Sequence, residues 1–341
     1  MDATELGLRR LVVPTGVGPL VVRAGRGSGS PVATLLLHGA AGSWTTWAPM
    51  LSSPSGVRLT DVIAVDLPGW GDTPGPVPDP AELAVAVAAV ARALGYPRWR
   101  VVGHSLGGVV ALDIAARFRD ETVAVGVVSP SGAGARAVIR RPVAGTMRLP
   151  WLAGMVVAMR MLRALGPLAA PLLRSLARSG MLRFLARPLF RHPDRIDRSV
   201  TDALATDIRP SAFLAAARIS RTHDDGVWRR IACPVRSVRG RHDVFVAATD
   251  PRAWSRMIDD HQDVVLEGSG HFAHVEQPDE TLRALRDVWA VDRAPARRDV
   301  WAVDRAPARV RAGANAAERV RASAVAPEGR LSAPRGATRR H

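Results

Sequence analysis

The sequence predicts an α/β fold in which a mostly parallel sheet carries helices on both faces and a helical segment is inserted late in the sheet. Three observations predict it. Short apolar runs alternate with helical patterns over the first 130 residues, strand-like runs disappear from about residue 131 to 228, and two strand–helix pairs return before about residue 290. Strands and helices that alternate at this spacing are typical of a parallel sheet covered on both sides.

The first part of the chain supplies the beginning of the sheet. Arg9–Val13 and Leu20–Ala24 are separated by a Gly/Pro turn and predict a hairpin. Val32–Leu37 and Val62–Val65 are continuous apolar runs, as expected for strands that are buried on both faces. The elements predicted after them are the helix Ala81–Leu94, the strand Arg100–Val102, the helix Leu106–Phe118 and the strand Val123–Val128.

The middle of the chain predicts a helical cap. Apolar helical stretches with arginines and prolines run through Leu149–Leu165, Leu168–Leu189 and Ala212–Ile219, and no strand-like run interrupts them. Strands return at Pro234–Val238 and Val264–Leu266, with helices at Ala248–Ile258 and Pro278–Val288. We therefore expect a core formed by residues 1–130 and 229–289 and a cap (lid) formed by residues 131–228.

The end of the chain contains a tandem duplication. Residues 286–297 read RDVWAVDRAPAR, and residues 298–309 repeat them without a change. Two such copies are too few for a stacked repeat fold, and a segment rich in Ala, Arg, Gly and Pro follows them. Residues 290–341 are predicted to be a disordered tail. A basic interaction arm is the alternative.

The charge of the chain lies mainly in the predicted cap and tail. All 47 basic residues are arginines, and the formal net charge is +16. Residues 131–230 contain 18 Arg and 6 Asp or Glu, and residues 290–341 contain 12 and 5. The chain has no nucleic-acid-binding motif, so nucleic acid is not expected as a partner. Peripheral contact with an anionic membrane surface stays open.

No stretch of the sequence predicts a signal peptide or a membrane span. The N-terminal segment MDATELGLRRLVV has early acids and lacks an apolar core. The apolar stretch near Trp151–Met159 is closed by Arg160, well short of the roughly 18–20 residues that span a bilayer. The expected location is cytoplasmic. The single cysteine, Cys233, excludes an intrachain disulfide and is predicted to be a small core residue.

The pattern G-x-S-x-G occurs at Gly103-His104-Ser105-Leu106-Gly107. It follows an apolar strand and opens a helix, which is the setting of a nucleophile elbow. The flanking glycines allow a tight turn that presents the serine hydroxyl at the end of the sheet. Ser105 is therefore the predicted nucleophile. The alternative is an ordinary glycine-rich turn in which Ser105 is a helix N-cap.

Two later residues complete a predicted catalytic triad, because a serine hydroxyl needs a base that a carboxylate orients. Asp243 lies in GRHD after one late strand, and His271 lies in GSGHF after the next. Both positions are carboxyl ends of strands, where open α/β sheets place their sites. We predict His271 as the base and Asp243 as its carboxylate. Of the rivals, His274 is expected to face the following helix, and Asp250 is expected to cap a helix.

The remaining requirement is an oxyanion hole of preorganised N–H donors. The glycine-rich loop His38-Gly39-Ala40-Ala41-Gly42 follows the strand Val32–Leu37. We predict that the backbone N–H groups of Ala40 and Leu106 bind the oxyanion. His38, Gly39 and His104 are expected to support the site, and no metal ligand is predicted.

The chain resembles the lid-bearing α/β-hydrolase superfamily, in its serine esterase and lipase branch. The segments LLLHGAAGSWTTW, DLPGWGDT, VVGHSLGG, GRHDVF and GSGHFAHVEQPDE match five landmarks of that superfamily in order, and the match covers residues from about 9 to 289. The resemblance implies an eight-stranded sheet, a helical cap inserted after the sixth strand, and no cofactor. Epoxide hydrolases and haloalkane dehalogenases of this superfamily have Asp as the nucleophile, so Ser105 argues against both activities.

Three functions are compatible with these residues. The first is hydrolysis of a small to medium hydrophobic ester or thioester through an acyl-enzyme, and the basic cap suggests that this small-molecule substrate carries an anionic group. The second is carbon–carbon bond hydrolysis of a vinylogous diketone by the same triad. The third is a catalytically inert ligand-binding protein, against which the complete triad argues.

Overall fold

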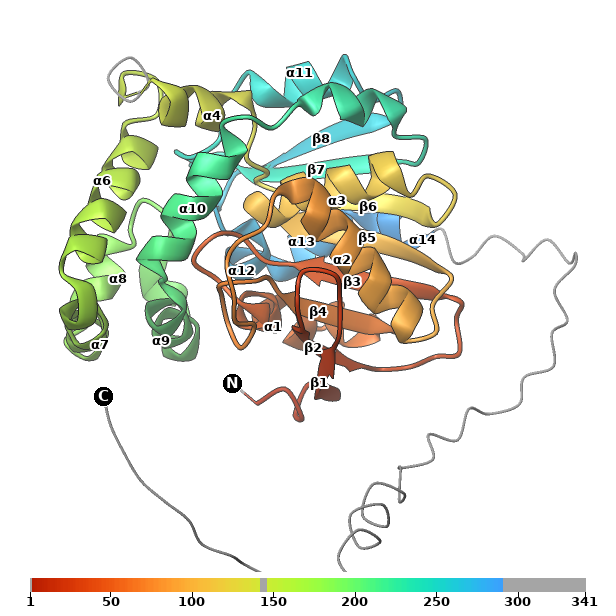
Figure 1. Ribbon diagram of the computed structural model, residues 1–341, viewed down its shortest axis with the longest axis horizontal. Helices are drawn as coiled ribbons and strands as arrows, with labels where there is room; N and C mark the ends of the chain where they lie inside the picture. Colours follow the sequence, from red (N-terminus) through yellow and green to blue (C-terminus); the bar gives the residue numbers. More distant parts are fainter. Residues whose placement is uncertain (1, 142–145, 291–341) are drawn as a thin grey trace, which may run out of the picture. The chain divides into compact units, whose positions relative to one another are not determined.

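The chain forms an eight-stranded sheet in the computed structural model, which describes residues 2–141 and 146–290 (Figure 1). The strands are β1 Leu8–Val13, β2 Leu20–Gly25, β3 Val32–Leu37, β4 Val62–Asp66, β5 Arg98–His104, β6 Thr122–Val128, β7 Val235–Gly240 and β8 His261–Leu266. Their order in the sheet is β1-β2-β4-β3-β5-β6-β7-β8. β2 is antiparallel to β1 and to β4, and all other neighbours are parallel. The predicted hairpin and mostly parallel sheet are confirmed.

Helices cover both faces of the sheet. Those of the core are α1 Ala48–Ser52, α2 Pro80–Ala93, α3 Leu106–Arg117, α11 Asp250–Ser255, α12 Ala273–Glu276, α13 Pro278–Ala284 and α14 Arg286–Ala290, with 3-10 turns η1 Trp44–Trp47 and η2 Gly56–Arg58. α2, α3 and α11 pack on one face, and α1, α13 and α14 pack on the other. Because side chains alternate along a strand, Leu35 of β3 belongs to the first cluster and Leu36 to the second.

The start of α2 shows how the sequence determines one of these helices. The Asp79 carboxylate accepts a hydrogen bond from the Glu82 N–H at 2.9 Å, and the Glu82 carboxylate accepts one from the Asp79 N–H at 3.2 Å. This reciprocal capping box satisfies two otherwise unpaired donors, and Pro80 follows at the first helical position. Leu83, Val87 and Val90 are buried on one side of the helix, which therefore packs on the sheet through that side.

The segment between β6 and β7 is helical and lies to one side of the sheet, as Figure 1 shows. Its helices are α4 Ala133–Arg140, α6 Pro150–Ala164, α7 Ala169–Arg178, α8 Met181–Leu185, α9 Arg198–Asp207 and α10 Pro210–Ser220, with 3-10 turns η3 Gly166–Leu168, η4 Pro193–Arg195 and η5 Asp225–Arg230. Phe190 and Ile196 of this segment form a hydrophobic cluster with Phe272 and Val275 of the core. The fold therefore has the helical cap after the sixth strand that the resemblance implies.

The helical limits within the cap differ from the predicted ones. Leu168–Leu189 is not one helix, because Gly180 has a φ of +75° and separates α7 from α8. Glycine adopts this left-handed conformation without strain, and it ends a helix. Two cap helices, α4 and α9, were not among the predicted stretches. α9 has its own start signal, since Asp197 accepts a hydrogen bond from the Ser199 N–H at 2.7 Å.

The C-terminal helices also differ from the prediction. Pro278–Val288 is divided into α13 and α14, and Ala248–Ile258 is reduced to the short α11. The described residues all belong to one compact unit. Apart from Ala290, the predicted tail with the second copy of the repeat lies outside the described residues.

No single helix within residues 2–141 and 146–290 is long and apolar enough to cross a membrane. Pro150–Ala164 and Gly166–Arg178 pass that test only as a pair, and this pair is bent by 115°.

Candidate active site

Ser105 stands on a sharp turn between β5 and α3. Its φ is +51° and its ψ is −113°, which is a strained conformation for a residue with a side chain. The turn requires glycine on either side: a Cβ on Gly103 would lie 2.1 Å from the Gly107 carbonyl oxygen, and one on Gly107 would lie 2.3 Å from the Leu37 oxygen. The Ser105 side chain makes no capping hydrogen bond to α3. This geometry is that of a nucleophile elbow rather than of a helix cap.

His271 and Asp243 meet beyond the ends of β8 and β7. Nδ1 of His271 lies 3.1 Å and 3.0 Å from the two carboxylate oxygens of Asp243. Asp243 also accepts a hydrogen bond from the Phe245 N–H at 2.8 Å. Burial favours the neutral acid, but the attraction and hydrogen bond of His271 and the Phe245 N–H outweigh it and hold the pKa of Asp243 below 3.8. The carboxylate therefore stays charged and fixes the orientation of the imidazole.

The Ser105 hydroxyl has a different partner from the predicted base. Its Oγ lies 3.2 Å from Oγ of Ser131, which follows β6. Among the described residues it makes no hydrogen bond with His271, although Ser105, Ser131 and His271 line the same cavity. The structure thus pairs two members of the predicted triad and places the third on the shared cavity wall.

The two predicted oxyanion donors lie on that wall as well. Within the described part of the chain, neither the Ala40 N–H nor the Leu106 N–H donates a hydrogen bond to another residue. The Ala40 loop lies directly against Ser105, because a Cβ on Gly39 would be 3.0 Å from the Ser105 Cβ and 2.7 Å from Nδ1 of His104. Two unpaired donors beside a serine hydroxyl form an arrangement that can hold an oxyanion.

His38 holds this loop in place through two hydrogen bonds of its ring. The Leu67 N–H donates a hydrogen bond to its Nε2 at 2.9 Å, so the ring proton is on Nδ1 and is donated to the Gly39 oxygen at 2.7 Å. Complete burial lowers the pKa of His38 to about 4, which keeps the ring neutral. His38 therefore links the Gly39 loop to the loop after β4 without adding a charge.

Two further buried histidines lie near His271: His104 packs next to its ring, and His274 packs next to His104. His104 donates a hydrogen bond from Nε2 to the His271 carbonyl oxygen at 3.1 Å. The prediction that His274 faces the following helix is wrong, because its ring packs between Trp47 and His104, with centroid distances of 4.5 Å and 4.6 Å. Burial, followed by the neighbouring histidines, lowers the pKa of His104 well below 6.5 and that of His274 to about 3. Apart from their place in the segments VVGHSLGG and GSGHFAHVEQPDE, nothing in the sequence indicates that these two side chains are buried.

Asp250 is also not the helix cap that the sequence suggested. It is 2% exposed and accepts a hydrogen bond from the Gly134 N–H at 3.1 Å. It therefore binds the first turn of α4 in the cap.

The cavity at Ser105 has a volume of about 530 Å³ and extends under the cap. Its wall is mainly aliphatic, with methionines from α6 and leucines from α6, α7 and α8. Typical lining residues are Leu152, Met155, Met159, Met161, Leu162, Leu165, Leu172, Leu173, Leu176, Leu182, Leu185 and Leu189. Among the described residues, the charged groups in the wall besides the histidines of the site are Arg136 and His223. The site can thus hold a hydrophobic molecule with its reactive group at Ser105.

Arg136 and His223 belong to a buried ionic cluster that the sequence did not reveal. Nε2 of His223 lies 3.0 Å from both carboxylate oxygens of Asp113 on α3, and Nδ1 lies 3.0 Å from Asp225. Asp225 also pairs with Arg136 of α4, and Trp228 donates from Nε1 to Asp113 at 2.7 Å. The cluster joins both ends of the cap to the core. The two cations are neutralised by the two carboxylates.

The metal-binding potential of the site is small. Within the described ranges, no group of three His, Cys, Asp or Glu side chains could hold a metal ion. Cys233 is buried, and burial raises the pKa of its thiol to about 11.

Comparison with known proteins agrees with this architecture. Residues 34–285 match the alpha/beta hydrolase family. A soluble epoxide hydrolase of Corynebacterium sp. (strain C12) is 38% identical over 96 residues, which are 28% of this chain and 32% of that protein. An uncharacterized protein of Mycobacterium tuberculosis is 29% identical over 268 residues, which are 75% of this chain and 74% of that protein. The solved structure of a thermophilic esterase from Thermogutta terrifontis is similar with a TM-score of 0.62 and 22% identity, covering 84% of this chain and 100% of that one.

These similarities differ in what they show. The matched region covers about a third of the epoxide hydrolase, and 22% identity to the esterase shows a common fold. The family match is broader, since it includes Ser105, Asp243 and His271 and runs from β3 to the end of α13. The chain belongs to the alpha/beta hydrolase family.

Proposed function

We propose that the protein hydrolyses a hydrophobic carboxylic ester or thioester through an acyl-enzyme. The observation that carries this proposal is one cavity wall that contains Ser105, His271 and the residues of two unpaired backbone N–H groups, with Asp243 behind His271 on its Nδ1. Each of these parts has a role in acyl transfer, and together they supply a nucleophile, a base and an oxyanion site.

The reaction follows from the geometry of these groups. Ser105 Oγ attacks the substrate carbonyl while Nε2 of His271 takes its proton, and the charged Asp243 stabilises the imidazolium through Nδ1. The N–H groups of Ala40 and Leu106 stabilise the tetrahedral oxyanion. His271 then protonates the leaving alcohol or thiol, and water hydrolyses the acyl-serine by the same path in reverse. For the first step the Ser105 hydroxyl turns from Ser131 to His271, which is a rotation about a single bond.

The cavity supports an uncharged, medium-sized acyl chain. Its aliphatic wall favours hydrocarbon, and the flexible side chains of Met155, Met159 and Met161 adapt to different shapes. Arg136 and His223 in the wall already face Asp113 and Asp225, so they offer little net charge to an anionic substrate. The same scarcity of polar groups favours an ester over a vinylogous diketone.

The epoxide hydrolase relative does not by itself suggest epoxide opening here. A carboxylate that attacks an epoxide forms an ester, which water can hydrolyse. A serine that attacks an epoxide would form an ether, which the same triad could not release. Ser105 therefore supports attack on a carbonyl.

The test is turnover of p-nitrophenyl esters from acetate to palmitate by the full chain, by Ser105→Ala and by Ser131→Ala. We expect Ser105→Ala to lose turnover and labelling by a fluorophosphonate probe. Ser131→Ala should keep probe labelling, because His271 and not Ser131 is the base. If Ser105→Ala turned over esters like the parent, or if the parent were not labelled, the proposal would be wrong.

A further inference from the structure

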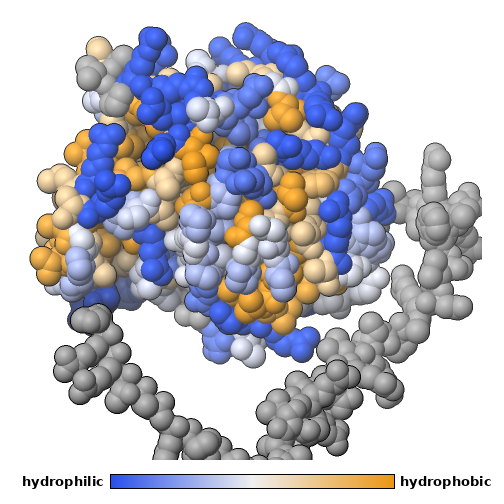
Figure 2. Space-filling model, in the orientation of Figure 1, coloured by the Kyte–Doolittle hydropathy of each residue, from blue (hydrophilic) through white to orange (hydrophobic). Residues whose placement is uncertain are grey.

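The cap exposes large hydrophobic side chains to an unusual extent. Ten of the fourteen large hydrophobic residues that are exposed within the described ranges lie between residues 147 and 185. Leu168 is 67% exposed, Met161 is 66% exposed and Phe184 is 57% exposed. Figure 2 shows hydrophobic residues gathered along the edge of the molecule that α6 and α7 form. We call the exposed surface of α6, η3, α7 and α8 the cap face. Contiguous exposed apolar surface of this kind marks an interaction site.

The cap face is continuous with the interior of the active-site cavity. Four of its side chains line that cavity and are nevertheless 41–66% exposed, namely Met161, Leu165, Leu172 and Leu185. The same aliphatic groups are therefore in contact with the outside and with the space in front of Ser105. A hydrophobic molecule held at the cap face would reach the cavity without crossing a polar surface.

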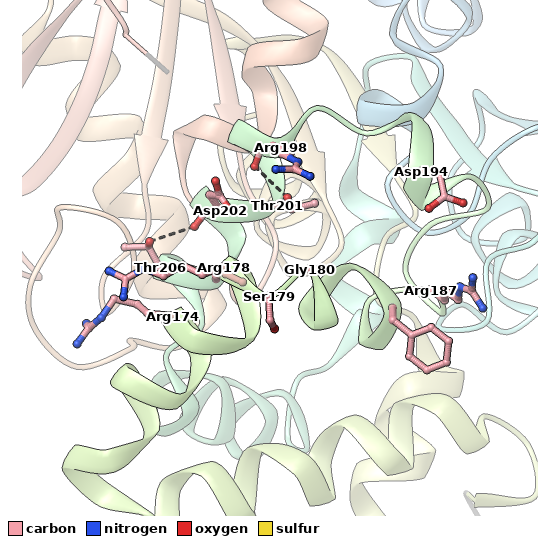
Figure 3. Close-up of a pocket in the computed structure, with 13 residues that line it drawn as sticks. Arg174, Arg178, Ser179, Gly180, Arg187, Asp194, Arg198, Thr201, Asp202 and Thr206 are labelled. Carbon is pink, nitrogen blue, oxygen red and sulfur yellow. Dashed lines mark hydrogen bonds between the residues drawn. The ribbon is translucent and has the colours of Figure 1, made fainter.

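The charged residues in the sequence of the cap-face helices are all arginines. Between Glu121 and Asp194 the sequence contains eleven arginines and no acid. Arg174, Arg178 and Arg187 line a second hollow of about 530 Å³, formed by α7, α8 and α9 (Figure 3). Within the described chain these three arginines make no salt bridge, whereas nine other arginines pair with a carboxylate. Asp194 and Asp202 only partly offset the charge of the hollow.

We propose that the cap face docks on an anionic lipid bilayer, with its apolar side chains in the interface and its arginines on lipid phosphates. Apolar and cationic groups on one face are the combination that binds such surfaces. The Arg187 guanidinium lies 4.6 Å from the centre of the Phe184 ring, so one contact combines both kinds of group. Two other occupants are disfavoured by like charge: a second copy of the cap face, and the tail, whose composition is also basic.

This docking goes beyond the proposed ester hydrolysis and is tested without turnover. The full chain is mixed with vesicles of phosphatidylcholine alone or with one third phosphatidylglycerol, and the bound fraction is measured by sedimentation. Each arginine near an anionic surface contributes roughly a fivefold gain in binding. Arg174→Gln/Arg178→Gln should therefore weaken binding to the anionic vesicles by roughly 30-fold.

A matched control removes the same charge elsewhere. Arg252 and Arg256 are exposed, have the same four-residue spacing and lie at α11, outside the cap. Arg252→Gln/Arg256→Gln should bind anionic vesicles like the parent. If both double variants lost binding equally, net charge or the tail would account for it and the cap face would not.

A second readout locates the contact. Cys233 is buried and its thiol has a pKa of about 11, so a thiol reagent does not label it readily. An environment-sensitive fluorophore is therefore attached at Leu168→Cys. Its emission should shift to the blue on anionic vesicles, whereas a label at Val85→Cys, on α2 and 53% exposed in the parent, should not change. An unchanged label at position 168, or a blue shift caused by self-association without lipid, would overturn the proposal. Ser105→Ala should bind vesicles like the parent, so docking and catalysis fail separately.

Discussion

His223 offers a quantitative test of the buried ionic cluster. Burial alone would lower its pKa, but the hydrogen bonds and charges of Asp113 and Asp225 outweigh that effect and raise the pKa of His223 to about 9. Its ordinary value is 6.5. Because the side chain is only 8% exposed, solvent screens these interactions weakly. Protonated His223 therefore stabilises the folded chain.

The size and the sign of this effect follow from linkage. Since each pKa unit corresponds to about 1.36 kcal/mol, the difference between 6.5 and about 9 amounts to roughly 3 kcal/mol. The pKa is raised in the folded state, so this stabilisation is fully present below pH 6.5 and is lost as the pH rises through about 9. His223→Gln removes the titrating group and with it this pH-dependent contribution.

The measurement is urea unfolding of the parent and of His223→Gln between pH 6 and pH 9.5. The free energy of unfolding should be higher for the parent than for the variant, and this difference should be about 3 kcal/mol larger at pH 6 than at pH 9.5. His242 is exposed, so His242→Gln serves as a control whose stability should follow that of the parent. If the parent and His223→Gln lost stability in parallel over this range, His223 would not be held protonated by the two carboxylates and the reasoning would fail.

Two other substitutions test the site and its turn. Asp243→Asn should lower kcat on p-nitrophenyl esters by about 10⁴-fold because it no longer holds His271 in the required tautomer, while circular dichroism stays unchanged. An Asn variant with parental kcat would show that Asp243 does not orient the base. Gly107→Ala would place a Cβ 2.3 Å from the Leu37 oxygen and should lower Tm by roughly 10 °C. Gly16→Ala meets nothing within 4 Å and should leave Tm nearly unchanged, so equal losses in the two variants would contradict the packing argument.

The sheet and the elbow were predictable because their signals are local. Continuous apolar runs such as Val32–Leu37 indicate strands that are buried on both faces, and the glycines around Ser105 indicate a turn that is too tight for a Cβ. Strand ends then indicated where Asp243 and His271 lie. Their 3.0 Å contact is a consequence of two adjacent parallel strands, β7 and β8, ending at the same edge.

The features that sequence reasoning missed depend on residues far apart in the chain. Asp113 and His223 are separated by 110 positions, and nothing near either of them indicates a partner. No role was predicted for Ser131, although its position after β6 puts it beside Ser105. In the cap, apolar periodicity continued across Gly180, and only its backbone conformation shows the break.

The histidines beneath His271 have a consequence for the path of the catalytic proton. In the proposed reaction His271 carries a proton from the attack of Ser105 until the leaving group departs. His104 lies beside His271, with 4.8 Å between the two ring centroids, and His274 packs on His104 at 4.6 Å. Both are far weaker bases in their buried positions, since the pKa of His274 is about 3 and that of His104 is well below 6.5. The two rings therefore stay neutral and do not take the proton from His271. The proton remains on His271 until the departing oxygen or sulfur accepts it.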